Sequence, residues 1–527
     1  MKRIFVLIVV LALLLPSSVL AYDIQEHQAG TLPLTDEPVT LTMWFVTNTT
    51  VSQYYSDYAE LPFFKEMEAR TGVHIDFELV SASSPAEAFN LMIASGELPD
   101  IIECSVSFGT EYDDGLDAAV DDRYFLDLTP YLDNLASDYQ AARTIDEATS
   151  RQTSTDAGRV VGFWQTYVFG YQPPWDGMFV RKDWLDKVGL AAPVTYDDWH
   201  TMLKAFKEQL GADAALQIGS DGTVFLNTLS AGYGVSDTFQ VKDKTIGYGP
   251  IMDGWREYLT MMNQWYKEGL INPDFLSATS KLTPDTSLIA SNETGATPGI
   301  YTLVGIYNSQ AEGADFIPVS TPVKQVGDTV YYGLNIAGTG AGNYTVISVD
   351  TKYPELCVEW LNYLYTYEGW LLSSYGVEGK NFTFDQNGKP QYTDYMTANE
   401  NGTDFSTMVN TETLMPSLGC AYDWTRETQV LSDDVLACLD MWRSNYVADR
   451  SQAYLLPSGV AMTQAENTEY ASIMADITTY VTENTTKFIT GERSLDEWDS
   501  YIGDIHGMNI EGAISLYQAA LDRYYAK

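Results

Sequence analysis

The sequence contains few positive charges and very few histidines. Only 29 of its 527 residues are lysine or arginine, against 72 aspartates and glutamates, and the formal net charge at pH 7 is −43. So acidic a surface repels nucleic acid and anionic membrane surfaces, and we expect neither as a partner. The four histidines lie far apart in the sequence, and none is within metal-ligand spacing of another. The sequence therefore gives no support for a histidine-based metal site.

Cysteine is equally scarce. The four cysteines are Cys104, Cys357, Cys420 and Cys438, with no CxxC pair and no zinc-like spacing. Cys420 and Cys438 are the nearest pair in sequence, and an oxidising compartment would permit a disulfide between them. Separate buried thiols are the alternative. In either case we expect no cysteine chemistry.

The chain also lacks the motifs that mark common catalytic sites. It has no GxSxG, no SxxK with suitable partners, no HExxH and no P-loop. The glycine-rich stretch 338–342 lacks the GxGxxG spacing and is expected to be a turn. Asp385 and Asn387 are spaced like calcium ligands, but no bidentate glutamate follows, so a hairpin with a tight Asn387-Gly388 turn is favoured. We expect no catalytic residue, no metal and no cofactor, and predict that the chain is not an enzyme.

Long apolar runs are absent except at the N-terminus. Lys2 and Arg3 precede the apolar run 4–15, and small residues follow up to Ala21. This pattern predicts a secretory signal peptide cleaved near Ala21. A membrane anchor is the alternative, although the run is shorter than the roughly 20 residues that a spanning helix needs. No lipid-accepting cysteine follows, so we expect an exported protein that is periplasmic, extracellular or held at the cell surface by other means.

The remaining chain is too long for a single hydrophobic core, so two or more lobes are expected. Apolar and polar residues alternate over 39–45 and 73–79, which is the period of a half-buried strand. Helical patterns follow at 61–71 and from Ser84. This β-α-β order predicts an α/β fold with mainly parallel sheets and helices on both faces, and the same pattern returns after residue 178.

Aromatic residues are present in excess, with 36 tyrosines and 12 tryptophans. Sugar rings present apolar C–H faces that stack on aromatic rings, while their hydroxyls need a few fixed polar groups. Trp199, Trp255 and Trp360 lie at helical spacing and are expected in the core. The candidates for ligand contact lie in loops or at strand ends, and they are Trp44, Tyr112, Trp164, Tyr167, Trp175, Tyr233, Tyr301 and Trp424.

Five segments carry a recognisable pattern. They are GELPD at 96–100, VRKDWLDKVG at 180–189, YKEGLINPDF at 266–275, YGVEG at 375–379 with DQNGKPQYTD at 385–394, and FITG at 488–491 with SLDEW at 494–498. In this order they resemble the extracellular solute-binding proteins of bacterial ABC importers, family 1, in the large oligosaccharide-type branch. The resemblance runs from about residue 39 to the end of the sequence.

The resemblance implies a periplasmic-binding-protein-like fold of two α/β lobes joined by a three-segment hinge. It also implies capture of a ligand, expected to be an oligosaccharide, by hinge closure, and its delivery to the transmembrane subunits of a permease. We expect a monomer. The expected partition is a signal peptide at 1–21, a flexible mature N-terminus at 22–38, an N-lobe of 39–170 with 298–340, and a C-lobe of 171–297 with 341–527. The hinge crossings are expected near 165–177, 296–300 and 335–345.

A ligand that closes two lobes must contact both of them. From the first lobe we expect Trp44, Asn48, Glu103 and Tyr112, and from the second lobe Arg181, Asn227, Tyr233 and Trp424. Trp164, Tyr167 and Trp175 are expected at the hinge, with Tyr301 as a further aromatic contact.

Three other interpretations stay open at this stage: a secreted carbohydrate-active enzyme, a binding protein that serves a sensor or chemoreceptor, and a peptide ligand. Some members of the resembled family that bind uronate oligomers carry a calcium loop after the helix that matches Trp199. Here that place, 209–215, has the sequence QLGADAA, so neither the calcium site nor a uronate ligand is carried over.

Overall fold

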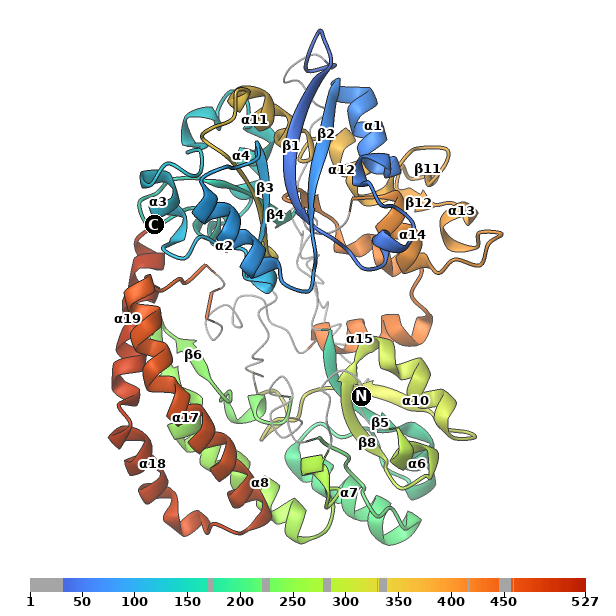
Figure 1. The fold of residues 1–527 in the computed structure, drawn as a ribbon. Coiled ribbons are helices and arrows are strands. Elements are labelled where there is room, and N and C mark those ends of the chain that lie inside the picture. Colours follow the sequence, from blue (N-terminus) through green and yellow to red (C-terminus); the bar gives the residue numbers. More distant parts are fainter. Residues whose placement is uncertain are drawn as a thin grey trace, which may run out of the picture.

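The computed structural model describes residues 32–168, 175–219, 228–277, 286–328, 330, 339–414, 418–444, 456–457 and 459–527. The expected signal peptide and Asn227 lie outside these ranges. Within them, no helix is both long enough and apolar enough to cross a membrane. The described chain forms two lobes, drawn one above the other in Figure 1, and the α/β fold class is confirmed.

The described part of the first lobe is built on a six-stranded sheet in the order β13-β4-β10-β3-β1-β2. β1 is parallel to β2 and β3, and β13 is parallel to β4, whereas β10 is antiparallel to both of its neighbours. The strands are Val39–Val46 (β1), Val73–Val80 (β2), Ile101–Ser105 (β3), Gly162–Tyr167 (β4), Thr339–Ile347 (β10) and Ala421–Tyr422 (β13).

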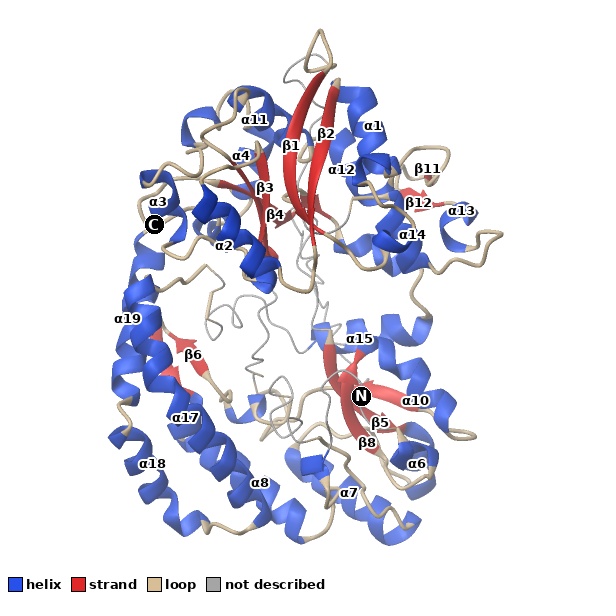
Figure 2. Cartoon of the chain, in the orientation of Figure 1, coloured by secondary structure: helices blue, strands red, loops and turns tan. Residues whose placement is uncertain are grey.

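Helices cover both faces of this sheet, as Figure 2 shows. The alternation predicted for β1 is confirmed: Leu41, Met43 and Phe45 pack on one face, and Trp44 packs on the other. The helices are Pro62–Thr71 (α1), Pro85–Ser95 (α2), Gly115–Asp121 (α3), Ser137–Arg143 (α4), Glu147–Gln152 (α5), Pro354–Tyr363 (α11), Tyr367–Tyr375 (α12), Asp394–Thr397 (α13) and Phe405–Glu412 (α14). The predicted hairpin is Phe382–Phe384 (β11) with Pro390–Tyr392 (β12).

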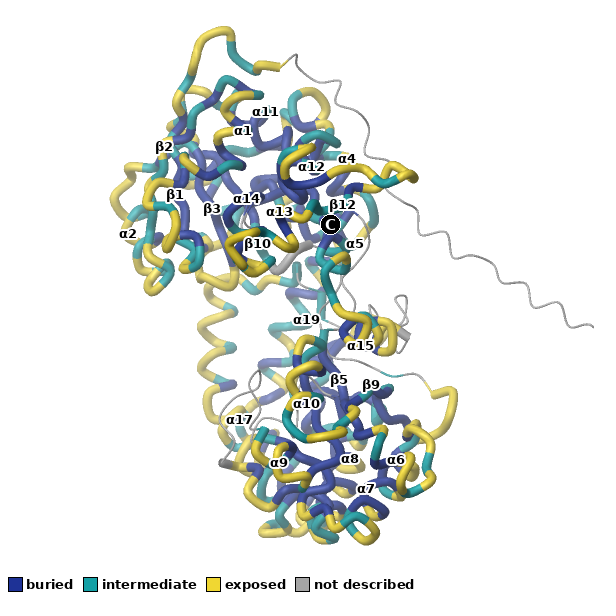
Figure 3. Tube along the Cα trace, turned by 90° about the vertical axis from the view of Figure 1, so that its right-hand side faces the viewer, coloured by how far each residue is buried: buried dark blue, intermediate teal, exposed yellow. Residues whose placement is uncertain are grey.

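The second lobe contains a three-stranded sheet in the order β8-β5-β9, in which both described pairings are antiparallel. Its strands are Asp176–Arg181 (β5), Ala296–Ile300 (β8) and Phe316–Val319 (β9), with a hairpin of Phe239–Lys242 (β6) and Thr245–Tyr248 (β7). Its helices are Lys182–Val188 (α6), Tyr196–Leu210 (α7), Asp253–Lys267 (α8), Ser287–Ala290 (α9), Val304–Gln310 (α10), Asp433–Ser444 (α15), Gln464–Thr490 (α17), Trp498–Gly507 (α18) and Ile510–Ala526 (α19). Each lobe has its own buried interior (Figure 3).

Strand pairing corrects the expected lobe boundaries. Because β8 and β9 pair with β5, residues 298–319 belong to the second lobe and not to the first. Because β10 and β13 pair with β4, the chain from β10 to β13 belongs to the first lobe. The expected crossing at 296–300 is therefore wrong, since these residues are a strand inside the second lobe.

The described elements pass between the lobes at three places. The chain leaves the first lobe after β4, returns to it before β10, and leaves it again after β13 toward α15. These three strands are neighbours in the first sheet, and the register pairs Thr339 with Thr166 and Tyr422 with Tyr167. The end of β4, the start of β10 and the end of β13 therefore meet at one edge of the sheet.

The last helix, α19, reaches from the second lobe to the first (Figures 1 and 3). Arg523 Nε lies 3.0 Å from Asp156 Oδ2, and Lys527 Nζ lies 3.1 Å from Asp156 Oδ1. Asp156 follows α5 of the first lobe. This ion-pair group is a further contact between the lobes beside the three passages.

All four cysteines are buried free thiols. Cys420 packs in the core of the first lobe, whereas Cys438 lies on α15 and packs in the second lobe. The disulfide considered between them is therefore not formed, and the alternative of separate buried thiols is confirmed. Nearness in sequence was misleading here because the third passage lies between the two residues.

Replacing Gly177 with alanine is expected to destabilise the second lobe. Gly177 lies on β5 directly after the first passage, and an added Cβ would lie 2.3 Å from the indole of Trp442 on α15. Overpacking of this kind costs about 1–3 kcal/mol. We therefore expect a lower melting temperature in differential scanning calorimetry.

Gly305→Ala in α10 is the matched control, because no heavy atom lies within 4 Å of its added Cβ. Its melting temperature should be unchanged or slightly higher, since alanine is more stable than glycine within a helix. Equal behaviour of the two variants would show that Trp442 is not fixed against β5.

Candidate functional site

Strand β4 carries aromatic side chains toward both of its neighbours. Trp164 stacks on Tyr344 of β10, with ring centroids 4.4 Å apart and an interplanar angle of 25°. Tyr167, the last residue of β4, lies edge-on to Tyr422 of β13, with centroids 5.5 Å apart. Both pairs follow directly from the strand register. Aromatic surface is therefore concentrated where the chain leaves the first lobe.

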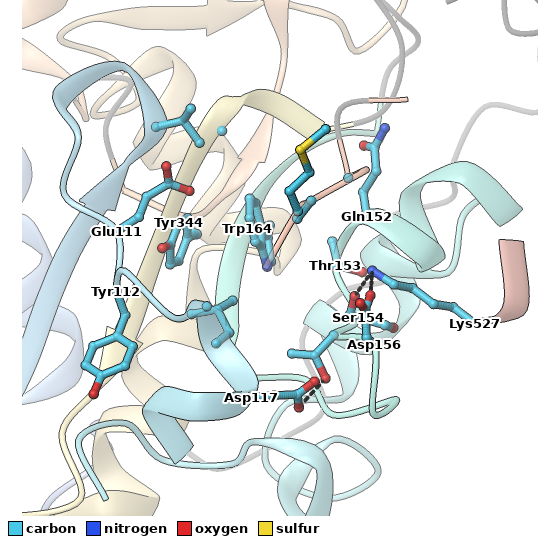
Figure 4. Close-up of a pocket in the computed structure, with 18 of the residues that line it drawn as sticks. Glu111, Tyr112, Asp117, Gln152, Thr153, Ser154, Asp156, Trp164, Tyr344 and Lys527 are labelled. Atoms are coloured by element: carbon cyan, nitrogen blue, oxygen red, sulfur yellow. Dashed lines mark hydrogen bonds and ion pairs between the residues drawn. The ribbon is translucent and has the colours of Figure 1, made fainter. Parts of the chain in front are cut away.

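A pocket of about 240 Å³ opens beside Trp164 (Figure 4). One side is formed by the first lobe, with Tyr112, Trp164 and Tyr344. The other side is formed by the end of the loop before α17 and by Lys527. Tyr112 and Trp164 were both predicted for the site, and the structure places them at the same pocket.

Some polar groups of this pocket have hydrogen-bond partners in the protein and others do not. The indole Nε1 of Trp164 is buried and has no hydrogen-bond partner among the described residues. Lys527 is fully engaged, because its Nζ donates to the Ser154 carbonyl (3.0 Å) and pairs with Asp156. Partial desolvation of its carboxyl group raises the pKa of Glu111, although the residue is exposed at the mouth of the pocket.

A second group of residues lies at the passages, and we call it the hinge cluster: Tyr167, Trp175, Tyr301, Tyr422, Trp424 and Glu427. Tyr301 begins the short 3₁₀ helix η9 (Tyr301–Leu303), and its N–H donates to the Trp175 carbonyl at 2.9 Å. Trp424 and Glu427 lie on η10 (Trp424–Gln429), which connects β13 with α15. The guanidinium of Arg443 lies 5.5 Å from the centre of the Trp424 ring.

Electrostatics link the members of the hinge cluster across the lobes. Burial, together with the negative charge of Glu427, raises the pKa of Tyr167 to about 12. Burial and the same carboxylate also raise the pKa of Tyr301. Tyr167 belongs to the first lobe and Tyr301 to the second, so one carboxylate acts on phenols of both lobes. Rings and a carboxylate together suit a hydroxylated ring as ligand.

Three expected site residues are instead part of the core. Trp44 is 3% exposed and packs edge-on against Phe89. Glu103 is fully buried on β3 and accepts the Val46 N–H at 2.8 Å. Arg181 is 1% exposed and forms two bonds of 2.7 Å with the Asp183 carboxylate. Because these three side chains have almost no accessible surface, they are not available for ligand contact.

Asn48 and Tyr233 also make local contacts. The Asn48 Oδ1 accepts the N–H of Thr50 and of Val51, so its side chain fixes a turn. Tyr233 stacks on Tyr196 within the second lobe, with ring centroids 4.2 Å apart. Asn227 lies outside the described residues.

The described residues contain no group of three or more His, Cys, Asp or Glu side chains arranged as metal ligands. Asp385, which had been considered as a calcium ligand, accepts the N–H of Asn387 (2.7 Å) and of Lys389 (2.8 Å) through Oδ1. These hydrogen bonds lower the pKa of its carboxyl group. Its geometry is explained by the hairpin turn.

Sequence reasoning missed Glu111, Tyr344, Tyr422 and Glu427. Tyr344 and Tyr422 reach β4 only through pairing between distant segments, and β13 is too short to give a hydrophobic period. Glu111 and Glu427 are two among 72 acidic residues, so no local signal distinguished them.

The family described as bacterial extracellular solute-binding proteins matches residues 52–369. Lipoprotein LipO of Bacillus subtilis is 30% identical over 224 residues, which cover 41% of this chain and 42% of LipO, so the match spans less than half of that relative. The fructooligosaccharide ABC transporter substrate-binding protein FusA of Streptococcus pneumoniae is 24% identical over 513 residues, which cover 89% of this chain and 88% of FusA.

Solved structures show the same fold. A solute-binding protein from Bifidobacterium longum infantis, described as binding human milk oligosaccharides and associated with an ABC transporter, superimposes with a TM-score of 0.69 at 18% identity. The superposition covers 93% of this chain and 99% of that protein.

The correction at Arg181 leads to a prediction about stability. Arg181→Lys keeps the positive charge but cannot form the two parallel bonds to Asp183. We expect the free energy of unfolding in urea to fall by about 2 kcal/mol, because a buried charge-assisted hydrogen bond is lost. The exposed Lys187 pairs with the same carboxylate at 3.2 Å, and Lys187→Gln should change stability little. A normal stability for Arg181→Lys combined with weaker ligand binding would restore Arg181 to the site.

Proposed function

Because this chain belongs to the bacterial extracellular solute-binding proteins, we propose that it is the substrate-binding component of an ABC transporter and captures an oligosaccharide. FusA and the Bifidobacterium protein are both named for oligosaccharide binding within ABC transport, and their matches cover 89% and 93% of this chain. This agreement supports the same role here, with the transmembrane subunits of a permease as the partner.

The hinge cluster is the observation that carries the proposal. Tyr167 comes from the first lobe, Tyr301 from the second, and Glu427 from the passage between them. A sugar at this place would stack on the rings, and its hydroxyls would donate to the carboxylate. Since these groups belong to both lobes, the contacts are complete only when the lobes are close together.

Hinge closure would follow from this arrangement. A ligand shifts the balance between open and closed forms only by the difference in its affinity for the two. Contacts shared by the lobes exist in the closed form alone, so a sugar that makes them favours closure. The three passages meet at one edge of the first sheet, which lets a few residues absorb the rotation.

We also propose binding without turnover and export through residues 1–21. The relatives are binding proteins, and binding alone accounts for the aromatic rings and the carboxylate of the hinge cluster. The charged start, apolar run and small residues before Ala21 are those of a secretory signal.

A thermal-shift screen tests the proposal. The ligands are neutral tetraoses of glucose, mannose, galactose and fructose, with a tetrapeptide as comparison. A ligand present at about 100 times its Kd stabilises the folded form by about 2.7 kcal/mol. We expect at least one oligosaccharide to raise the melting temperature, no tetrapeptide to do so, and no sugar to be degraded on incubation.

Tyr167 and Tyr301 come from different lobes, and each would lose a ring that stacks on the sugar when it is replaced. We therefore expect Tyr167→Ala and Tyr301→Ala each to weaken binding of the active sugar at least tenfold in calorimetry. Tyr353→Ala is the control, because Tyr353 is 43% exposed at the start of α11. Turnover of any glycan would show an enzyme instead. Unchanged affinity in both variants would move the ligand away from the hinge cluster.

A further inference from the structure

The pocket beside Trp164 has a composition that selects among sugars by charge. Resting on the proposed function, we propose that this pocket is a subsite for one uncharged sugar ring and that its carboxylates exclude uronates and other anionic sugars. The inference rests on the size of the pocket, on its unpaired polar groups and on the placement of its one basic side chain.

The size suits a single ring. Ligand pockets usually measure about 300–1,000 Å³, and this one, at about 240 Å³, lies just below that range. It can therefore hold one unit of an oligosaccharide whose other units lie elsewhere. Trp164, fixed by its stack on Tyr344, supplies the aromatic wall.

The unpaired polar groups are complementary to hydroxyls. The Trp164 Nε1–H is a buried donor without a partner among the described residues. The same holds for the core indoles of Trp199 and Trp255, but Trp164 lines the pocket, where a ligand or water can complete its hydrogen bond. Glu111 forms no hydrogen bond or ion pair with the described residues. Its ionised carboxylate can only accept hydrogen bonds. A hydroxyl both donates and accepts, so a ring with neighbouring hydroxyls can satisfy both groups.

The charges of the lining are unfavourable for an anion. Glu111, Asp114, Asp117 and Asp156 all line the pocket, whereas Lys527 is its one basic residue. Lys527 is 7% exposed and already held by Asp156 and the Ser154 carbonyl.

The basic side chains near the pocket also form ion pairs with the protein's own carboxylates. Arg523 pairs with Asp156, and Arg159 faces Asp117 at 3.7 Å. An entering carboxylate would meet Glu111 and Asp114, and no lining residue offers it an unpaired cation. Both acids are exposed, so the repulsion between like charges is greatest at low salt. The pocket therefore selects a neutral sugar both by binding the neutral ring and by repelling an anionic one.

Matched pairs of probes test the inference. The probes are the neutral tetraoses of the thermal-shift screen and the same oligosaccharides oxidised at C6 to uronates, measured by calorimetry at low salt. We expect the wild-type protein to bind the neutral member of an active pair at least tenfold more tightly than its uronate. Added salt should reduce this ratio, since it screens the repulsion.

Two variants place the effect in the pocket. The double variant Glu111→Gln with Asp114→Asn should bring the affinity ratio close to one, by raising the affinity for the uronate. Trp164→Phe keeps an aromatic wall but removes the indole N–H, and should lower the affinity for the neutral sugar several-fold. The double variant Glu492→Gln with Asp499→Asn is the charge-matched control, because both residues are exposed and follow the far end of α17, about 40 Å along a helix of 27 residues.

The outcomes separate this inference from the proposed function. If no oligosaccharide binds, the proposed function fails and the inference fails with it. If neutral and uronate members bind equally, or if the double variant keeps the wild-type ratio, the inference alone is wrong. Equal effects of the control double variant and of Glu111→Gln with Asp114→Asn would assign the discrimination to net charge and would also overturn the inference.

Discussion

The pairing of β4 with two strands from distant parts of the chain is the constraint on which the rest of the structure depends. β10 and β13 lie on either side of β4, and neighbouring strands are about 4.8 Å apart. The ends of these three strands that lead to the second lobe therefore lie within about 10 Å of one another. In the second lobe, Asp176 at the start of β5 pairs with Ile300 at the end of β8. Tyr301 is thereby placed at the same junction, and the hinge cluster follows from the two registers.

Three arginines of this acidic chain are held by carboxylates or carbonyls of the folded protein. Arg181 is the last residue of β5 and is bound by Asp183. Arg426 lies on η10 in the third passage, 2% exposed, with its guanidinium donating to the Ser374 carbonyl at 3.0 Å. Arg523 joins α19 to the first lobe. A buried guanidinium without partners would be strongly destabilising, so Arg181 and Arg426 stay committed to the fold. Around the pocket, Asp117 and Asp156 face basic side chains, whereas Glu111 and Asp114 have no ion-pair partner among the described residues.

The sequence analysis was right about the fold class and about several elements. The alternations over 39–45 and 73–79 became β1 and β2. It was right that Trp199, Trp255 and Trp360 are buried. It placed Tyr112 and Trp164 at what proved to be one pocket. It was wrong where the partner of a residue decides its role: Arg181, Glu103 and Trp44 have residue types suited to a sugar site, but their contacts lie inside the core.

By itself the sequence determined the local features of this protein: the acidic charge, the strand and helix patterns, the excess of aromatic residues and the ordered motifs of the family. These depend on residues within one or two turns of each other, whose spacing is visible in the chain. Only the tertiary structure decided which strands are neighbours, and hence where the lobes divide and which rings face one another. Tyr167 and Tyr422 are far apart in the sequence and are brought together by the pairing of β4 with β13. No local pattern encodes such a pairing, because it depends on the free energy of the whole sheet.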